Sequence, residues 1–297
     1  MSKNIKLAWF LSFNLLSFSV LCCELSVSLP KIESSKDQLI VSLFKLSIGK
    51  VIDSTCITSI NEIITDGRKT RYIDNNLISV VWASASSIAE RDLQAIKIPI
   101  FKGLLGYRIF VINERDQPIF DQVETLQDLQ KFTAGQGLFW GDTKVLRAAG
   151  INVITSSQGR RLWQMLNLKR FDFMPLAVHE PWKDLSQRQE LELAVEKNLM
   201  LVYPSAFYFY VSHKNKALYE ALIEGMTLAL KDGSYDELLY HSDMIQSVIK
   251  YANFEKRKII RVENPYFSPG LQALTPKDEL VATTDLIDFL TKKPENR

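Results

Sequence analysis

Residues that could carry catalysis or hold a metal are few in this sequence, and they lie far apart. The three histidines, His179, His213 and His241, are not spaced as a set of metal ligands. His179-Glu180 has no second histidine one helical turn away, which excludes the helical zinc-protease motif. We therefore interpret each histidine as a structural residue and expect neither a metal site nor a cofactor.

The glycine and serine motifs of common enzymes are incomplete. In Gly135-x-Gly137-x-x-Trp140, the tryptophan stands where a dinucleotide-binding fingerprint needs its third glycine. The sequence has no phosphate-binding loop ending in Gly-Lys-Ser/Thr and no Gly-x-Ser-x-Gly nucleophile turn. We expect a protein that binds a molecule and catalyses no reaction.

Composition indicates an ordinary globular protein. The chain has 297 residues, of which 46% are hydrophobic and 24% charged, enough for one large domain or two lobes of about 100 residues. Lys and Arg number 36 against 34 for Asp and Glu, and no basic stripe emerges. This charge balance argues against nucleic acid as a partner.

The first 23 residues have the features of a cleaved secretory signal. Lys3 and Lys6 precede an apolar run from Leu7 to Leu21, which is shorter than a comfortable membrane span, and polar sequence begins at Glu24. We predict a soluble periplasmic product; an uncleaved anchor or a lipoprotein is the alternative.

Cysteine usage gives no disulfide framework. Cys22 and Cys23 fall at the signal boundary, and Cys56 is the one cysteine clearly inside the mature chain. We predict that Cys56 is a small buried hydrophobic residue.

The elements that must position any site alternate between strands and helices. Apolar runs predict strands over residues 24–29, 77–82, 96–101, 107–112, 132–137, 151–155, 171–178 and 199–212, the last divided by Pro204. Helical spacing and caps predict helices over residues 36–48, 57–64, 125–128, 142–149, 160–168, 181–198 and 215–230, and one restarting at a Ser234-x-x-Glu237 capping box. This alternation predicts an α/β fold with largely parallel sheets and helices on both faces. The charged run 255–258 indicates a solvated turn.

Four stretches, in their order and spacing, resemble a known family. They are Val80–Arg91 (Val-Val-Trp-Ala-Ser-Ala-Ser-Ser-Ile-Ala-Glu-Arg), Phe132–Gly137, Arg170–Phe173 and Leu218–Tyr240 with Leu-Lys-Asp-Gly-Ser-Tyr-Asp-Glu-Leu-Leu near its end. They are similar to family 3 of the extracytoplasmic solute-binding proteins, the type II periplasmic binding proteins of ABC importers. The resemblance implies a two-lobed fold with a ligand cleft between the lobes. It implies lobe 1 at 24–109 plus 208–270, lobe 2 at 110–207 and a C-terminal tail at 271–297.

The resemblance also implies which residues face the cleft. Arg91 matches an arginine that grips a ligand carboxylate, a role suited to a guanidinium, with a surface ion pair as the alternative. The other predicted ligand-binding residues are Trp82, Ser84, Ser86, Gln136, Trp140, Asp142, Thr143, Glu180 and Tyr203. The alternatives are a solvated turn for the serines, core packing for the aromatic residues and a helix N-cap for Asp142.

One departure from the family bears on the ligand. Amino-acid receptors of the family place an acid a few residues after the position of Asp172, where it holds the ligand ammonium. Met174–Ala177 offers no acid here, and Glu180 or His179 is the substitute we consider.

We predict a monomeric periplasmic protein that captures a small polar or anionic metabolite by hinge closure. It would serve an ABC permease in uptake or a membrane sensor. Two alternatives are a cleft enzyme of the dehydratase or cell-wall lyase type, with Glu180 as its carboxylate, and a ligand-free interaction module.

Overall fold

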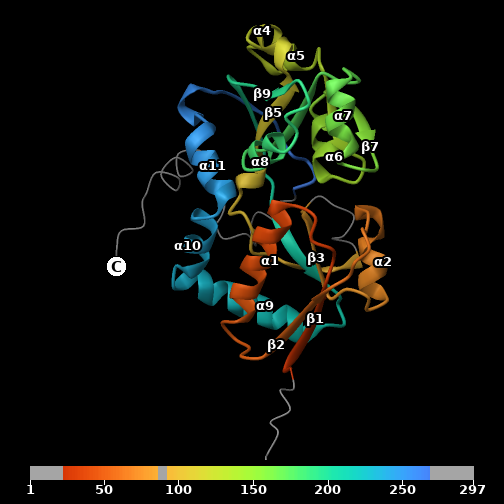
Figure 1. Ribbon diagram of the computed structural model, residues 1–297, viewed down its shortest axis with the longest axis vertical. Coiled ribbons are helices and arrows are strands. Elements are labelled where there is room, and N and C mark those ends of the chain that lie inside the picture. Colours follow the sequence, from red (N-terminus) through yellow and green to blue (C-terminus); the bar gives the residue numbers. More distant parts are fainter. Residues whose placement is uncertain (1–22, 86–91, 268–297) are drawn as a thin grey trace, which may run out of the picture.

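The computed structural model, which describes residues 23–85 and 92–267, forms two lobes that each contain a β-sheet (Figure 1). We call the lobe with the three-stranded sheet lobe 1 and the lobe with the seven-stranded sheet lobe 2. In Figure 1 lobe 1 lies below lobe 2. Most of the predicted signal segment and the tail 271–297 lie outside the described residues.

Lobe 1 combines a parallel strand pair with an antiparallel sheet. β1 (Leu25–Leu29) pairs in parallel with β2 (Thr55–Ser59). The sheet has the order β3 (Val80–Ser84), β11 (Phe207–Val211), β4 (Gln94–Ile96). Its helices are α1 (Ser35–Ile48), α2 (Lys69–Asp74), α9 (Lys216–Lys231), α10 (Ser234–Tyr240) and α11 (Asp243–Tyr251).

Helix α1 shows how local sequence produces this lobe. Ser34 caps it by accepting a hydrogen bond from the Asp37 amide, and the Asp37 side chain accepts one from the Ser34 amide in return. Leu43 and Phe44 on its inner face are fully buried. Gly225 lets α9 approach α1 closely, because a Cβ there would overlap the carbonyl oxygen of Ser47. The cap therefore fixes where α1 begins, and α1 presents its first residues to lobe 2.

Lobe 2 is built on one sheet with strand order β12-β10-β5-β8-β6-β7, with β9 paired to β5. The strands are β5 (Tyr107–Asn113), β6 (Thr133–Gly137), β7 (Asn152–Ser156), β8 (Phe173–Ala177), β9 (Leu193–Val195), β10 (Leu199–Val202) and β12 (Lys258–Arg261). The helices are α4 (Gln117–Phe120), α5 (Leu126–Leu129), α6 (Gly141–Ala148), α7 (Arg161–Asn167) and α8 (Pro181–Ser186).

Strand direction brings polar residues to one edge of this sheet. β6 and β8 run in parallel, so their carboxyl ends lie at the same edge. β5 is antiparallel to β8, and β10 is antiparallel to β5, so β5 starts and β10 ends at that edge too. The chain leaves this edge toward lobe 1. In open α/β sheets the carboxyl ends of strands are the usual place for ligands.

Two of the segments that cross between the lobes, those before β5 and after β10, lie side by side. The Tyr203 amide donates a hydrogen bond of 3.1 Å to the carbonyl oxygen of Gly106. A Cβ at Gly106 would overlap the Tyr203 carbonyl oxygen, so this approach requires glycine. Apolar packing continues across the hinge, because one core cluster joins Phe44 of lobe 1 with Val178 and Met200 of lobe 2.

The α/β two-lobed fold predicted from the sequence is confirmed. The parallel pairs β1-β2, β6-β7, β6-β8 and β10-β12 are accompanied by antiparallel pairs at the crossing strands β5 and β11. Residues 258–261, expected with lobe 1, pair with β10 in the sheet of lobe 2. The other predicted lobe limits stay predictions.

Four secondary-structure predictions were wrong in detail. The strand predicted over 96–101 instead spans Gln94–Ile96 (β4), where it pairs with β11. Residues 57–64 were predicted as a helix, but Thr55–Ser59 form β2 because they pair in register with β1. The helix predicted over 181–198 ends at Ser186, and Leu193–Val195 form β9 against β5. Ser234 is the first residue of α10 rather than its cap; Gly233, at φ 80°, takes the N-cap position.

Two side chains also differ from prediction. Cys56 is exposed and forms a disulfide with Cys23, across Cα atoms 5.6 Å apart, because the β1-β2 pairing brings these positions together. Arg257 lies in the charged run expected to be solvated, yet it is buried. Its guanidinium donates to the carbonyl oxygens of Ala252, Glu196 and Leu199.

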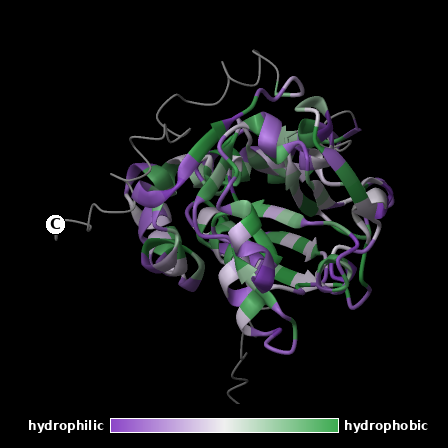
Figure 2. Ribbon diagram, turned by 90° about the horizontal axis from the view of Figure 1, so that it is seen from above, coloured by the Kyte–Doolittle hydropathy of each residue, from purple (hydrophilic) through white to green (hydrophobic). Residues whose placement is uncertain are grey.

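Hydrophobic residues concentrate in the interior of the molecule. Figure 2 shows hydrophobic strands toward the middle of the molecule and hydrophilic stretches around its outside. Within residues 23–85 and 92–267, no helix is long and apolar enough to cross a bilayer.

Candidate ligand-binding site

The two lobes are joined by an ion pair between the start of α1 and the end of β8. Lys36 Nζ of lobe 1 lies 2.7 Å from Glu180 Oε1 of lobe 2. The same ammonium lies 5.5 Å from the centre of the Phe207 ring, within reach of a cation–π interaction. Glu180 Oε2 accepts a hydrogen bond of 2.9 Å from the Ala177 amide, which folds the carboxylate back over the end of β8.

Electrostatics keep both members of this pair charged. Burial alone raises the pKa of the Glu180 carboxyl, but Lys36, His179 and Arg108 outweigh burial and lower the pKa to about 2. Burial alone lowers the pKa of the Lys36 ammonium, but the Glu180 carboxylate more than compensates, and the pKa is raised. Glu180 is therefore a fixed anion at neutral pH.

A second buried cluster lies beside this pair at the same edge of the lobe 2 sheet. Asp142 Oδ1 accepts hydrogen bonds from Arg108 Nη2 at 2.7 Å and from the Tyr203 hydroxyl at 2.8 Å. Burial, together with the negative Asp142, raises the pKa of Tyr203 well above its usual value, although Arg108 acts against this shift. Asp142 and Tyr203, both predicted as ligand-binding residues, are thus brought together, and they bind each other.

Several buried polar atoms at this edge have no hydrogen-bond partner within the described residues. They are Arg108 Nε, Gln136 Oε1 and both ring nitrogens of His179. The Gln136 amide nitrogen donates to the Pro175 carbonyl oxygen at 2.8 Å, so half of this side chain is satisfied. Buried polar groups are nearly always paired in proteins, and such atoms mark a place for water or a ligand.

His179 stays uncharged in this setting. Its ring packs against Phe101 with centroids 4.5 Å apart, and the side chain is fully enclosed. Burial lowers the pKa of His179 to about 4, and the positive charges of Lys36 and Arg108 act in the same direction. The negative charge of Glu180 opposes this shift but does not outweigh it.

The lobe 1 residues predicted to bind ligand are only partly described. The Trp82 indole N–H donates to Asp37 Oδ1 at 2.9 Å, next to Lys36 on α1, and the ring is buried. Ser84 is buried at the end of β3. Ser86 and Arg91 lie outside the described residues, and their predicted role stays a prediction.

Trp140 and Thr143 support the loop between β6 and α6. The Thr143 hydroxyl donates to the Gly137 carbonyl oxygen at 2.7 Å. The indole of Trp140, which precedes α6 at its N-cap position, lies against Gly137 and Gly159. Both side chains contact their own lobe in this conformation, and they shape the loop that faces lobe 1.

The lobes also touch at the α2 side of the molecule. The Phe139 ring, in the loop after β6, lies against Gly67, where a Cβ would come within 3.0 Å of the ring. Together with the Lys36–Glu180 pair, this contact indicates that the two lobes are closed on one another.

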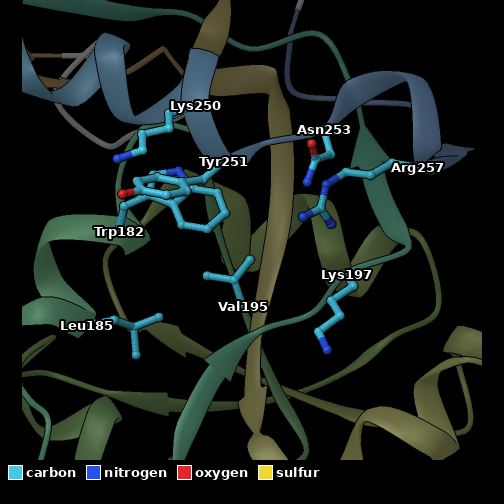
Figure 3. A pocket seen from close by; sticks show the side chains of 8 residues that line it. All are labelled: Trp182, Leu185, Val195, Lys197, Lys250, Tyr251, Asn253 and Arg257. Carbon is cyan, nitrogen blue, oxygen red and sulfur yellow. The ribbon is translucent and has the colours of Figure 1, made fainter.

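A groove of about 360 Å³ lies at the hinge, on the α11 side (Figure 3). Trp182 and Tyr251, from lobes 2 and 1, overlap at one end with centroids 5.5 Å apart, and the Arg257 guanidinium points toward the groove from the other end. Lys183 of α8 also lies 3.7 Å from Asp243 of α11. The remaining lining residues are Leu185, Val195, Lys197, Lys250 and Asn253. This groove is thus a seam between α8 and α11 and is lined by none of the predicted site residues.

Sequence reasoning missed Lys36 and Arg108, which hold the two anions Glu180 and Asp142. Arg108 had a detectable signal, because it is a charged residue inside the strongly apolar strand Tyr107–Ile112. Lys36 had none, since a lysine in the first turn of an amphipathic helix is ordinary. His179 was considered as a substitute acid and is instead neutral and enclosed.

Comparison with known proteins gives the fold. No family model and no curated protein matches the chain. Among solved structures, an ancestral arginine-binding protein bound to arginine has a TM-score of 0.56 at 15% identity, covering 73% of this chain and 98% of that one. A histidine kinase sensor domain with similarity to periplasmic binding proteins has a TM-score of 0.53 at 14% identity, covering 69% of this chain and 85% of that one.

A third structure is an ancestral amino acid-binding protein described as a precursor of cyclohexadienyl dehydratase. It has a TM-score of 0.53 at 11% identity, covering 73% of this chain and 95% of that one. At these identities the likeness establishes a shared periplasmic-binding-protein fold.

Proposed function

We propose that this chain, which has the fold of the periplasmic binding proteins, is an exported receptor that encloses a small polar or anionic metabolite between its lobes. The observation that carries the proposal is the group of buried, unpartnered polar atoms where the lobe 2 strands end: Arg108 Nε, Gln136 Oε1 and the His179 ring nitrogens. A bound solute in a closed cleft would supply partners for such atoms.

Export to the periplasm is part of the proposal. The predicted signal of 1–23 would remove Cys23, so we propose instead that cleavage leaves Cys23 in the mature chain. The Cys23–Cys56 disulfide then supports export, because disulfides persist in oxidising compartments such as the periplasm. A membrane permease for uptake and a membrane sensor are the two classes of partner that we propose. We further propose that the receptor acts as a monomer.

The charge state of the cleft supports binding over catalysis. A general acid or base works best with a pKa near the operating pH. The pKa of Glu180 is lowered to about 2 and that of His179 to about 4, so neither group is tuned for proton transfer near neutral pH. We therefore propose no enzymatic activity.

A thermal-shift screen against a metabolite panel tests the proposal. A solute at a hundredfold excess over its Kd stabilises the folded protein by about 2.7 kcal/mol, which raises Tm by about 5–10 °C. His179→Leu removes two unpartnered nitrogens and should weaken the response, whereas the exposed His213→Leu should not. The absence of any shift would refute the receptor and favour an interaction module. Conversion of the bound solute to product would favour an enzyme.

A further inference from the structure

The Lys36 ammonium occupies a complete cation site between the lobes. It lies 2.7 Å from a Glu180 oxygen and 5.5 Å from the centre of the Phe207 ring. A carboxylate together with an aromatic face is the chemistry that recognises an ammonium group. Here the cation comes from the protein itself, from the first turn of α1.

Glu180 has little capacity left for a second cation. One oxygen binds Lys36, the other accepts the Ala177 amide, and the side chain is only 12% exposed. A ligand ammonium at this carboxylate would lie close to the Lys36 charge and be repelled by it. The neighbouring Asp37 is also engaged, since its oxygens accept hydrogen bonds from Ser34 and Trp82.

Lys36 itself retains donor capacity. An ammonium carries three N–H donors, and one is used on Glu180. Its side chain is 30% exposed, so the lysine is not fully enclosed by the protein. The junction thus offers hydrogen-bond donors to an oxygen acceptor, while its two nearest carboxylates are already occupied.

We propose that Lys36 is a specificity-determining residue that stands in for a ligand ammonium. The site then selects carboxylates that lack an amino group, such as 2-oxo acids and dicarboxylates, and rejects α-amino acids. This inference rests on the proposed receptor function and adds to it the class of ligand.

Matched pairs of ligands test this role, because an amino acid and its 2-oxo acid differ mainly at one group. We would titrate the full chain calorimetrically with glutamate and 2-oxoglutarate, alanine and pyruvate, and phenylalanine and phenylpyruvate. The wild type should bind one 2-oxo acid at least about tenfold more tightly than its amino acid. Lys36→Met should reverse this preference, and the exposed Lys31→Met should keep it.

A double variant provides a control in case the single variant Lys36→Met does not fold. Lys36→Met leaves Glu180 as an unpaired, largely buried carboxylate, whereas Lys36→Met with Glu180→Gln removes both charges. The double variant should lose the preference for either member of a pair. Native mass spectrometry of the purified wild type then identifies any ligand retained from the cell.

The outcomes separate the two proposals. A retained or titrated ligand with a free ammonium, bound at least as tightly as its 2-oxo counterpart, would refute the role of Lys36 and leave the receptor function intact. If the wild type bound no ligand of any kind, the receptor function would fail, and the role of Lys36 with it.

Discussion

The neutral, enclosed His179 makes the stability of this protein depend on pH in a predictable window. The pKa of His179 is lowered from 6.5 to about 4, so the unfolded chain binds more protons than the folded one as pH falls below 6.5. Folding stability must therefore decrease as the solution is acidified. From pH 8 to pH 5 the expected loss is about 2 kcal/mol, approaching about 3 kcal/mol near pH 4.

Between pH 8 and pH 5 the change in stability due to His179 can be measured separately from that due to Glu180. The pKa of Glu180 is lowered from 4.5 to about 2, so its stabilising contribution is present above pH 4.5 and is lost only as pH falls toward 2. Urea unfolding of ligand-free protein at pH 8, 7, 6 and 5 would measure the effect. His179→Leu should remove the 2 kcal/mol loss and, at pH 8, leave the free energy of unfolding unchanged or higher, because two buried nitrogens no longer lack partners.

The exposed His213→Gln is the matched control and should retain the wild-type pH dependence. If His179→Leu lost as much stability between pH 8 and pH 5 as the wild type, another group would be responsible. Our account of His179 would then be wrong.

Three further predictions concern the packing of the hinge and the N-terminus. Asp142→Ala should lower the free energy of unfolding by about 3–5 kcal/mol in urea titrations, because it leaves a buried guanidinium unpaired; a loss below 1 kcal/mol would contradict this. Gly106→Ala should lower Tm and weaken ligand binding together, because its Cβ overlaps the Tyr203 carbonyl oxygen, and unchanged values would show that the crossing can relax. Intact-mass analysis of exported protein should show that cleavage retains Cys23, and Cys56→Ser should lower the free energy of unfolding by about 3 kcal/mol under oxidising conditions. A mature chain that begins after Cys23 would exclude the disulfide.

Much of the fold could be predicted from the sequence, because apolar runs and helical spacing along the chain agreed with the elements that form. The Pro204-divided apolar run became β10 and β11, and helical spacing located α1 and α9 within a residue or two. The short elements were missed because they depend on distant partners. β9 and β12 form only by pairing with β5 and β10, and β2 forms only beside β1.

The candidate site was predictable only in outline. Glu180, Asp142 and Tyr203 were expected near the cleft, and they lie where the lobes meet. Their partners were not predictable, because Lys36 is 144 residues from Glu180 and Arg108 is 34 residues from Asp142. Spacing along a chain reports neighbours within one element. The first pair instead depends on how the two lobes come together, and the second on how β5 and α6 pack within lobe 2.

More than two segments of the chain pass between the lobes, and this limits how the protein can move. Besides the pair that meets at Gly106 and Tyr203, residues 252–257 lead from α11 of lobe 1 to β12 of lobe 2, and Phe267 packs again in the core of lobe 1. Chain links and continuous apolar packing at the hinge resist sliding of one lobe over the other, so we expect opening to be a rotation about an axis close to these segments. Spin labels on α2 and α7, far from the hinge, should then report a larger distance change on ligand binding than labels on β4 and β5, beside it. Contacts far from the hinge, such as Phe139 against Gly67, therefore have the greatest leverage on the opening equilibrium.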